Sequence, residues 1–231
     1  MAVVVLVLQL QKKLASLGAK IVLSARREDE LQELSEELGD NAMFVVTDVK
    51  KRSNLDELVA KTIEKFGHVD VMWNNAGIMP ISLFEEGRVE EWDDMIDINI
   101  KGVLYGINAV LPHMLERKSG HILTTSSITG IKTAPGTGVY SATKYAVRAL
   151  MDALRQEVYK HIRVTTIYPG RTSSELMDTI KSDKIKKLLK DNLANRPAME
   201  GEAIADAVIY AIGQPATVNV NDVVVRPLGE A

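Results

Sequence analysis

The sequence of 231 residues contains no cysteine. This absence excludes disulfide bonds, iron–sulfur clusters and zinc sites built on thiolates. The four histidines are scattered, and none shares the spacing of metal ligands on one helix; they are His68, His113, His121 and His161. We therefore expect no metal ion in the chemistry of this protein.

The sequence also lacks a large excess of charge and a long hydrophobic run. It has 28 basic and 31 acidic side chains and a net charge of −3, so it has no electrostatic footprint for nucleic acid or for an anionic membrane. The apolar segment 2–8 is far shorter than the roughly 20 residues that cross a membrane, and no basic flank marks a signal peptide. We expect a cytoplasmic protein that binds a small molecule.

Short apolar segments rich in β-branched residues recur along the chain, at 2–8, 20–25, 42–48, 69–74, 121–127, 162–169 and 222–227. Their apolarity is continuous rather than alternating, which is typical of strands covered on both faces. Segments with helical periodicity separate many of them, at 28–38, 54–66, 90–117 and 140–160. This alternation predicts an α/β fold, with a doubly wound parallel sheet of about seven strands flanked by helices on both faces.

No repeat, low-complexity segment or linker divides the chain, so residues 1–231 are treated as one domain. Ligands of such sheets bind beyond the carboxyl ends of the strands. The polar residues that follow the predicted strands all fall at that edge. Candidate functional residues are therefore sought there.

Tyr140 and Lys144 are four residues apart on a predicted helix, so their side chains lie on one face about one turn apart. The pKa of a free tyrosine, about 10, is too high for proton exchange at neutral pH. A neighbouring ammonium favours the phenolate and lowers that pKa. Tyr140 could then act as a general acid or base. Taken alone, the same spacing is also found on ordinary helix faces.

Other residues stand in a fixed order around this pair. Ser127 ends a predicted strand thirteen residues before Tyr140, and NNAG at 74–77, Asn99 and the dipeptide 169–170 stand at matching places. In this order they resemble the motifs of the short-chain dehydrogenase/reductase family. The resemblance implies a Rossmann domain and an oxidoreductase that transfers hydride between NADP(H) and a small polar alcohol or carbonyl. The pieces NNAGIMP and VNVNDVVVRP look most like the branch of hydroxy-acid (serine-type) dehydrogenases and clavaldehyde-type reductases.

The resemblance implies a catalytic role for each of four residues. Tyr140 would be the proton donor or acceptor, and Ser127 would hydrogen-bond the substrate oxygen. Lys144 would hold the nicotinamide ribose and lower the pKa of Tyr140. Asn99 would bind a water in a proton relay from Lys144. Considered alone, Asn99 could be a mid-helix residue with a local hydrogen bond, and Ser127 a satisfied hydroxyl at a strand end.

The predicted strand 20–25 leads into Ala25-Arg26-Arg27, with no acid before Glu28. An acid at this place accepts hydrogen bonds from the ribose of NAD, whereas a basic residue accommodates the 2′-phosphate of NADP. We predict NADP, with Arg26 as the main phosphate partner and Ser24 and Arg27 as helpers. A merely solvated pair of arginines is disfavoured, because positive charge at a helix N-terminus is unfavourable without an anion.

The resemblance also implies where the rest of the cofactor lies. The adenosine half would contact Asp48, Val49, Asn75, Ala76 and Gly77. The nicotinamide half would contact Tyr140, Lys144, Pro169, Gly170 and Thr172, with Ser174 as a possible addition. Both the NNAG and the Pro-Gly segments also occur as ordinary turns.

The family carries a glycine-rich turn after its first strand, whose backbone N–H groups hold the cofactor pyrophosphate. This sequence has no Gly, Pro, Asn, Asp, Ser or Thr between Met1 and Ser16, so nothing marks a turn before the predicted helix Gln9–Leu17. We expect that residues near 5–11 are absent from the sequence as written. A real deletion would instead make the chain a catalytically impaired binding or scaffold protein.

The segment 171–197 would fold over the site as a substrate lid. Leu176, Met177 and Ile180 would form an apolar wall, and Arg171 would pair with an acidic group of the substrate. The lysines of this segment are typical of a solvated helix face.

The predicted helix 140–160 carries a broad stripe of small residues, which is also typical of a helix in a core. In similar proteins this helix packs against its copy, so we expect a homotetramer or a homodimer. An epimerase or dehydratase on an extended relative of this fold is disfavoured, because such chains carry a longer C-terminal substrate domain.

Overall fold

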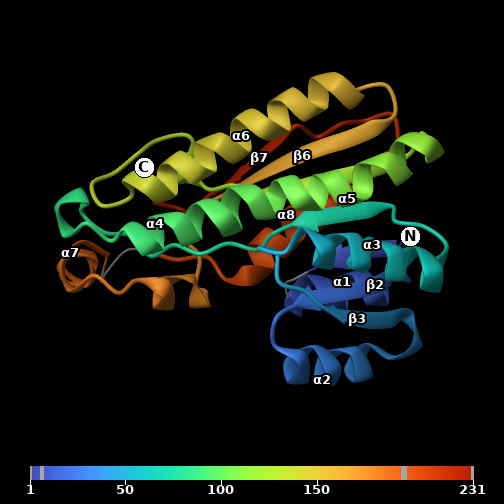
Figure 1. The fold of residues 1–231 in the computed structure, drawn as a ribbon, viewed down its shortest axis with the longest axis horizontal. Coiled ribbons are helices and arrows are strands. Elements are labelled where there is room, and N and C mark those ends of the chain that lie inside the picture. Colours follow the sequence, from blue (N-terminus) through green and yellow to red (C-terminus); the bar gives the residue numbers. More distant parts are fainter. Residues whose placement is uncertain (1, 6–7, 194–196, 230–231) are drawn as a thin grey trace.

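The computed structural model describes residues 2–5, 8–193 and 197–229. A single parallel sheet lies at its centre, with seven strands in the order β3-β2-β1-β4-β5-β6-β7 (Figure 1). The strands are β1 (Ala2–Val5), β2 (Lys20–Ala25), β3 (Ala42–Val46), β4 (Val71–Asn74), β5 (Gly120–Thr125), β6 (Ile162–Pro169) and β7 (Asp222–Val225). The predicted doubly wound sheet is confirmed. Its strand order reverses between β1 and β4, where ligand crevices form in such folds.

Helices cover both faces of the sheet. One face is covered by α1 (Leu8–Ser16), α2 (Glu28–Leu38) and α8 (Gly201–Ile212). The other is covered by α3 (Arg52–Phe66), α5 (Gly102–Arg117) and α6 (Gly138–Val158), which lie in front in Figure 1. The remaining helices, at the edge beyond the strand ends, are α4 (Val89–Ile96) and α7 (Asp183–Leu193). Short turns complete the fold: η1 (Gly39–Asn41), η2 (Phe84–Glu86), η3 (Asp97–Lys101), η4 (Ile128–Gly130) and η5 (Glu175–Thr179).

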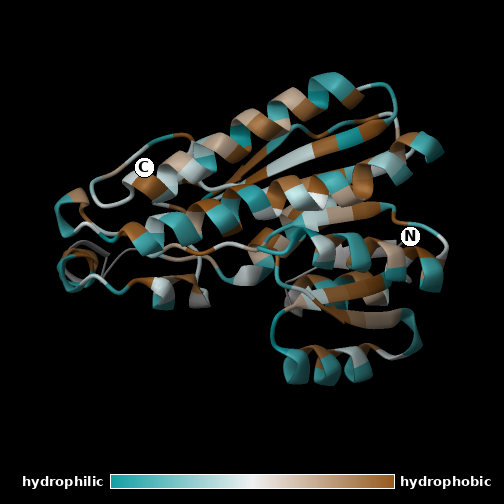
Figure 2. Ribbon diagram, viewed as in Figure 1, coloured by the Kyte–Doolittle hydropathy of each residue, from teal (hydrophilic) through white to brown (hydrophobic). Residues whose placement is uncertain are grey.

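The core lies between the sheet and its helices on each side. Ile21, Val22 and Leu23 of β2 are all fully buried, which explains why the strand is apolar at consecutive positions. Burial of each such side chain contributes about 1.5–3 kcal/mol. Figure 2 shows the hydrophobic colour concentrated on the strands, whereas α2 is largely hydrophilic.

The predicted helix 90–117 is interrupted. The π-helical turn η3 separates α4 from α5 and carries Asn99. A π turn inserts one residue into a helix, so the faces of the two flanking helices are offset and a side chain can be turned into the protein. Periodicity alone did not predict this interruption.

The predicted first strand is shorter than 2–8, since β1 ends at Val5 and α1 begins at Leu8. Residues 6 and 7 lie outside the described residues, so the expectation about a missing glycine-rich turn falls largely beyond what the structure describes. No helix within the described part of the chain is both long enough and apolar enough to cross a membrane.

Candidate active site

The pair Tyr140 and Lys144 lies at the start of α6. The helix begins after Pro135 and Gly136, where Gly136 has a φ of +83° that favours glycine. Tyr140 and Lys144 are each 4% exposed. The Lys144 Nζ lies 5.7 Å from the centre of the Tyr140 ring and donates a hydrogen bond of 2.9 Å to the Thr125 carbonyl. The ammonium is therefore held beside the phenol, at the carboxyl end of β5.

Ser127 lies two residues beyond the end of β5. Its Oγ accepts a hydrogen bond of 3.1 Å from the Thr129 N–H and so caps the turn η4. The Ser127 side chain also lies near enough to the Tyr140 hydroxyl to act on its pKa. The neighbouring Ser126 donates 3.0 Å to the Lys144 carbonyl, which ties the strand end to α6. The structure thus brings Ser127, Tyr140 and Lys144 together.

Gly130 is a residue of this site that sequence reasoning missed. A Cβ atom at Gly130 would lie 2.5 Å from the Ser126 Oγ and 2.8 Å from the Lys144 carbonyl oxygen. Because that carbonyl belongs to the backbone of α6, it cannot move aside cheaply. Only glycine lets η4 approach the helix this closely. The signal was its place three residues after Ser127.

Asn99 is buried and holds two other segments. Its Nδ2 donates to the Ile78 carbonyl at 3.0 Å and to the Thr143 Oγ1 at 3.1 Å, and its Oδ1 accepts 2.9 Å from the Ile78 N–H. These partners lie 21 and 44 residues away, so the interpretation of a local mid-helix hydrogen bond is wrong. A Cβ at Gly77 would lie 3.3 Å from the Asn99 Oδ1 and 3.6 Å from the Lys144 Nζ. Gly77, Asn99 and Lys144 therefore adjoin.

Burial dominates the electrostatics of the pair. It raises the pKa of Tyr140 to about 12, although the Ser127 side chain acts in the opposite direction. It also lowers the pKa of Lys144 to about 8. Burial therefore keeps the pKa of Tyr140 above its ordinary value in this structure, and the lowering of that pKa by Lys144 stays a prediction. At neutral pH Tyr140 is a protonated donor beside a largely charged ammonium.

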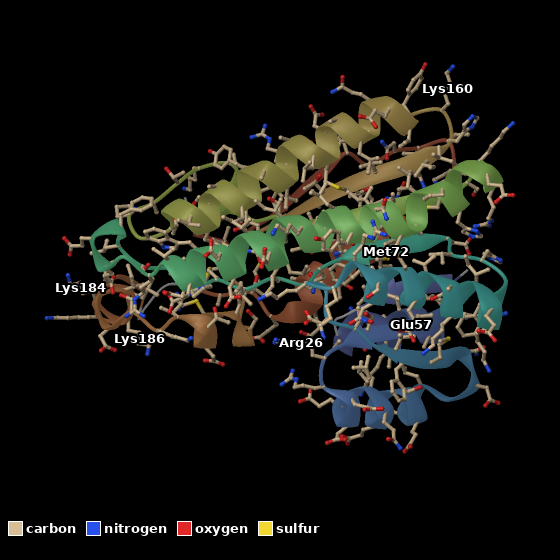
Figure 3. All side chains as sticks on the ribbon, in the orientation of Figure 1. Arg26, Glu57, Met72, Lys160, Lys184 and Lys186 are labelled. Carbon is tan, nitrogen blue, oxygen red and sulfur yellow. The ribbon has the colours of Figure 1, made fainter. Side chains whose placement is uncertain are left out.

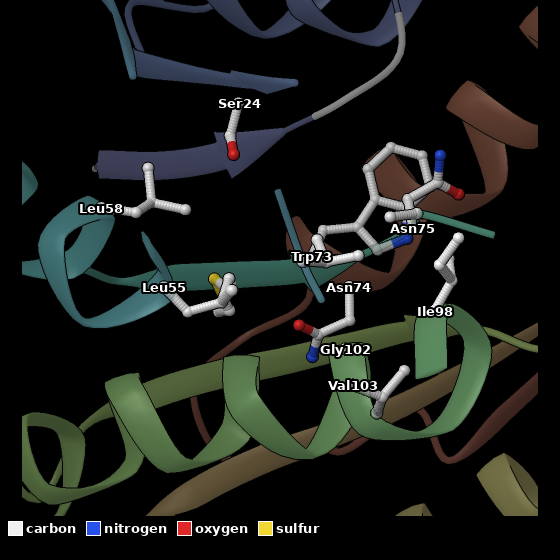
Figure 4. Close-up of a pocket in the computed structure, with 12 residues that line it drawn as sticks. Ser24, Leu55, Leu58, Trp73, Asn74, Asn75, Ile98, Gly102 and Val103 are labelled. Carbon is white, nitrogen blue, oxygen red and sulfur yellow. The ribbon is translucent and has the colours of Figure 1, made fainter. Parts of the chain in front are cut away.

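A small pocket, partly open to solvent, lies beside β4 (Figure 4). Its lining includes four of the predicted cofactor residues, Ser24, Val49, Asn75 and Ala76. Sequence reasoning missed the other wall, which includes Leu55, Leu58, Ile98, Gly102 and Val103. A Cβ at Gly102 would lie 3.1 Å from the Val49 side chain, so this glycine lets α5 begin close to the segment after β3.

Thr125 links the pocket to the catalytic pair. Its hydroxyl donates 2.7 Å to the Asn75 Oδ1 and accepts 3.0 Å from the Trp73 Nε1, while its carbonyl accepts from Lys144. Figure 4 shows Trp73 and Asn75 side by side at one end of the pocket. Thr125 had drawn no attention in the sequence, because its role depends on partners in β4 and α6.

Among the predicted cofactor residues outside the pocket lining are Arg26, Arg27 and Asp48. Arg26 is exposed at the surface next to α2 (Figure 3). Arg27 is also exposed and pairs with Glu30 at 3.0 Å. Asp48 accepts a hydrogen bond of 3.0 Å from the Lys50 N–H and so stabilises its own turn.

The predicted nicotinamide turn after β6 is fastened to neighbouring backbone. The Gly170 N–H donates 2.7 Å to the Val225 carbonyl, and the Thr172 Oγ1 donates 3.1 Å to the Gly170 carbonyl. Thr172 also forms a β-bridge with Met199. Pro169 ends β6 directly before this turn. None of these residues contributes to the pocket beside β4.

The segment after β6 covers Tyr140. Tyr140 belongs to a buried apolar cluster, here called the Tyr140 cluster, together with Ile81, Met95, Ile180 and Ile185, and with Ile78, Met79, Leu83, Trp92, Val139 and Leu189 around them. Of the predicted apolar wall, only Ile180 belongs to this cluster, and Met177 is 37% exposed. Ile185 of α7 was missed.

Polar contacts tie the same segment to the turn η2. The Ser182 Oγ donates 2.8 Å to the Glu86 Oε1 and accepts 3.2 Å from the Ile185 N–H, so it caps α7. Glu86 also accepts from the Leu83 N–H and from Arg88. The Ser182 hydrogen bond is the main reason that the pKa of Glu86 lies below its usual range.

No group of three or more His, Asp or Glu side chains in the described ranges is arranged to hold a metal ion. The chemistry that this arrangement offers is proton transfer at Tyr140, next to a pocket that four predicted cofactor residues line.

Comparisons with known proteins give a consistent result. The family model described as short chain dehydrogenase matches residues 6–185. An uncharacterized oxidoreductase of Listeria monocytogenes is 46% identical over 223 residues, which cover 94% of this chain and 90% of that protein. An uncharacterized oxidoreductase of Staphylococcus saprophyticus is 44% identical over 218 residues, which cover 93% of this chain and 88% of that protein.

Solved structures are similar over the whole chain. The closed form of serine dehydrogenase complexed with NADP+ has a TM-score of 0.92 and 33% identity, and the alignment covers 100% of this chain and 96% of that one. Serine dehydrogenase from Escherichia coli has a TM-score of 0.85 and 31% identity, with both chains covered completely. A 3-ketoacyl-(acyl-carrier-protein) reductase from Brucella melitensis complexed with NADH has a TM-score of 0.85 and 25% identity, over 97% of this chain and 96% of that one.

Proposed function

The chain belongs to the short-chain dehydrogenase family and is an oxidoreductase that uses a nicotinamide cofactor, and we propose that it transfers hydride between NADP(H) and a small alcohol or carbonyl substrate. The observation that carries the proposal is the burial of Tyr140 beside the Lys144 ammonium, 5.7 Å from the centre of the phenol ring, with the Ser127 side chain near its hydroxyl. Proton transfer to or from a substrate oxygen needs such a donor at a fixed position.

The residues present fit a dinucleotide. The pocket beside β4 lies at the switch point of the sheet, and Ala76 presents little bulk where a ligand must approach the backbone. Ser24, Val49, Asn75 and Ala76 would hold the adenosine half there. Arg26 has no ion-pair partner among the described residues, which supports a role towards the 2′-phosphate of NADP. When bound, the cofactor supplies the hydride.

The chain itself supplies the proton. In the reductive direction, Tyr140 donates its phenolic proton to the substrate oxygen while the carbonyl carbon accepts hydride, and Ser127 hydrogen-bonds the same oxygen. The resulting phenolate lies beside the Lys144 ammonium, which stabilises it and returns a proton to it. Solvent then restores the proton of Lys144 through a relay at Asn99, whose position between Ile78 and Thr143 supports this role.

We also propose that residues 1–231 form one domain with a substrate lid at about 171–197. The proposed enzyme is a cytoplasmic homotetramer or homodimer. The membership of Ile180 and Ile185 in the same buried cluster as Tyr140 supports the lid.

The alternative function is a catalytically impaired binding or scaffold protein, as a real lack of the glycine-rich turn would produce. A fluorescence titration with NADPH and NADH, on protein whose intact mass matches the sequence, separates the two functions. Tight binding of NADPH supports the oxidoreductase. Absence of binding of either nucleotide supports the alternative.

The variant Tyr140→Phe tests the chemistry directly. It should lower the rate of NADPH-dependent carbonyl reduction on the order of 10²–10⁴-fold, because it removes the general acid. NADPH binding should remain. Tyr145→Phe is the matched control, since Tyr145 lies on the same helix and its hydroxyl donates to the Ile131 carbonyl instead. Undiminished turnover by Tyr140→Phe would refute the mechanism.

A further inference from the structure

Thr125 is the last residue of β5, and its polar groups bind partners on opposite sides of the sheet. Its hydroxyl lies between Trp73 and Asn75, whereas its carbonyl accepts a hydrogen bond of 2.9 Å from the Lys144 Nζ. Trp73 belongs to the core on the side of α1 and α8, and Lys144 belongs to α6 on the other side. One residue thus connects the end of β4 to the catalytic lysine.

The hydroxyl of Thr125 has a fixed direction. Trp73 is 1% exposed, and its indole N–H can only donate, so the Thr125 oxygen accepts from it at 3.0 Å. The single proton of the hydroxyl then goes to the Asn75 Oδ1, at 2.7 Å. Loss of the hydroxyl would leave the Trp73 N–H without this acceptor in a site removed from water, which is unfavourable.

These two hydrogen bonds lie where the backbone ladder on that side of β5 ends. The register of β4 with β5 stops at the pair Asn74 and Thr124, so Thr125 lies one residue beyond it. On its other side, Thr125 is still in register with Ile167 of β6. The side chain of Thr125 therefore takes over from the ladder in holding the end of β5 against β4.

The Thr125 carbonyl is an acceptor for a buried ammonium. Lys144 is 4% exposed, and burial lowers its pKa to about 8. A hydrogen bond to the ammonium favours the charged form and so opposes a further fall of that pKa. Since an ammonium on a flexible stem takes its position from what it binds, the carbonyl determines how Nζ lies beside the Tyr140 ring.

We infer that Thr125 is a positioning residue of the proposed reaction: its hydroxyl, held by Trp73 and Asn75, fixes the carbonyl that keeps the Lys144 ammonium beside Tyr140. The inference rests on the proposed function, in which that ammonium stabilises the phenolate. It also means that Asn75, which lines the pocket beside β4, is connected to Lys144 through a single residue.

The test removes the hydroxyl and keeps the carbonyl. Thr125→Val has nearly the shape of threonine, and Thr125→Ser retains the hydroxyl. With NADPH and methylglyoxal, a small carbonyl compound, Thr125→Val should lower kcat about 10-fold. The fall of kcat with rising pH should also begin at lower pH, because the ammonium is less well held. Thr125→Ser should behave as the wild type in both respects.

Thr165→Val is the matched control. Thr165 is a fully buried threonine of the neighbouring strand β6, and its hydroxyl accepts from the His121 Nε2 at 2.7 Å and donates to the Val220 carbonyl at 2.6 Å. The variant loses a comparable pair of hydrogen bonds, with partners near the amino end of β5 and before β7. It should lower the free energy of unfolding as much as Thr125→Val does and leave the pH profile of kcat unchanged.

A measurement on the free protein separates the inference from the proposed function. The pKa of Lys144 is followed by NMR of its ¹³C-labelled side chain, whose signal is assigned by its loss in Lys144→Met. The pKa should be about 8 in the wild type and lower in Thr125→Val. Trp73→Phe, which removes one of the two hydrogen bonds of the hydroxyl, should lower the pKa by less and serves if Thr125→Val fails to fold.

An unchanged pKa of Lys144 in these variants, or a loss of kcat in Thr125→Val no larger than in Thr165→Val, would overturn the inference and leave the oxidoreductase intact. A wild type that neither reduces methylglyoxal with NADPH nor oxidises L-serine with NADP would count against the proposed function. The NMR comparison would still decide whether Thr125 positions Lys144.

Discussion

The two halves of the candidate site are built differently. In the catalytic half, Ser127, Lys144 and Asn99 each have hydrogen-bond partners, and those partners come from several elements of the fold. In the nucleotide half, Arg26 is exposed at the surface, while Ser24, Val49, Asn75 and Ala76 line the pocket beside β4. The catalytic half thus depends on buried side chains that other elements hold, whereas the nucleotide half combines pocket-lining residues with an exposed cation.

The largest expected effect comes from breaking the catalytic half at Lys144. Lys144→Met should lower kcat for carbonyl reduction on the order of 10²–10³-fold, because the phenolate formed at Tyr140 loses its neighbouring ammonium. Steady-state kinetics at saturating NADPH measures this loss. Arg148→Met, one turn further along α6, is the control and should retain activity. Equal rates for Lys144→Met and the wild type would mean that the ammonium is not needed.

The same residue predicts two pH dependences. The pKa of Lys144 in the folded protein is about 8, so the rate of reduction should fall as pH rises through about 8 and the ammonium is lost. For stability, the unfolded chain binds more protons between pH 8 and 10.5, since the folded pKa lies below the ordinary value of 10.5. The free energy of unfolding contributed by this group therefore rises over that range. Denaturant unfolding at pH 7.5 and 9.5 should show a rise in the wild type that is absent in Lys144→Met.

The second largest effect is expected on the affinity for NADPH, in the nucleotide half of the site. Insertion of a turn of the type T-G-x-x-x-G-x-G between Val5 and Leu8 should raise the affinity for NADPH at least ~10-fold, because hydrogen bonds to a charged group contribute about 1.5–3 kcal/mol each. Calorimetric titration measures the affinity. An inserted serine-rich segment of equal length is the control. If the chain binds NADPH equally well before and after the insertion, its backbone N–H groups already hold the pyrophosphate.

The third effect concerns the preference between the two nucleotides. Arg26→Asp should raise the Kd for NADPH about 10-fold and leave the Kd for NADH unchanged or lower, because the acid repels a 2′-phosphate and accepts from ribose hydroxyls. Arg27→Asp should have a smaller effect, since Arg27 already pairs with Glu30. An equal rise in the Kd for NADPH and the Kd for NADH would argue that Arg26 acts only on folding.

The smallest effect lies at the lid over the catalytic half. Ser182→Ala removes the cap of α7 and the donor to Glu86, at a cost of about 1 kcal/mol, so KM should rise a few-fold while kcat stays nearly constant. Ser53→Ala is the control, since Ser53 is exposed on α3, which is not part of the lid. A loss confined to kcat would contradict a role in closing the lid.

Local sequence patterns were enough to predict the fold and most of the residues that the structure brings together at the catalytic site. Continuous apolarity identified β5 and β6, and helical periodicity placed Tyr140 and Lys144 on one face of α6. Because the carboxyl ends of parallel strands meet at one edge, Ser127 could be expected near Tyr140 without any coordinates. The residues missed in the sequence, Thr125 and Gly130, act through atoms of other elements that no local pattern contains.

By itself, the sequence determined the α/β architecture, the order of its motifs and the edge of the sheet where they gather, since these follow from periodicity and strand direction. Only the tertiary structure decided the π turn that carries Asn99, the hydroxyl of Thr125 between Asn75 and Trp73, and the raised pKa of Tyr140. Burial decides that pKa, and burial belongs to the assembled helices and lid rather than to any one segment.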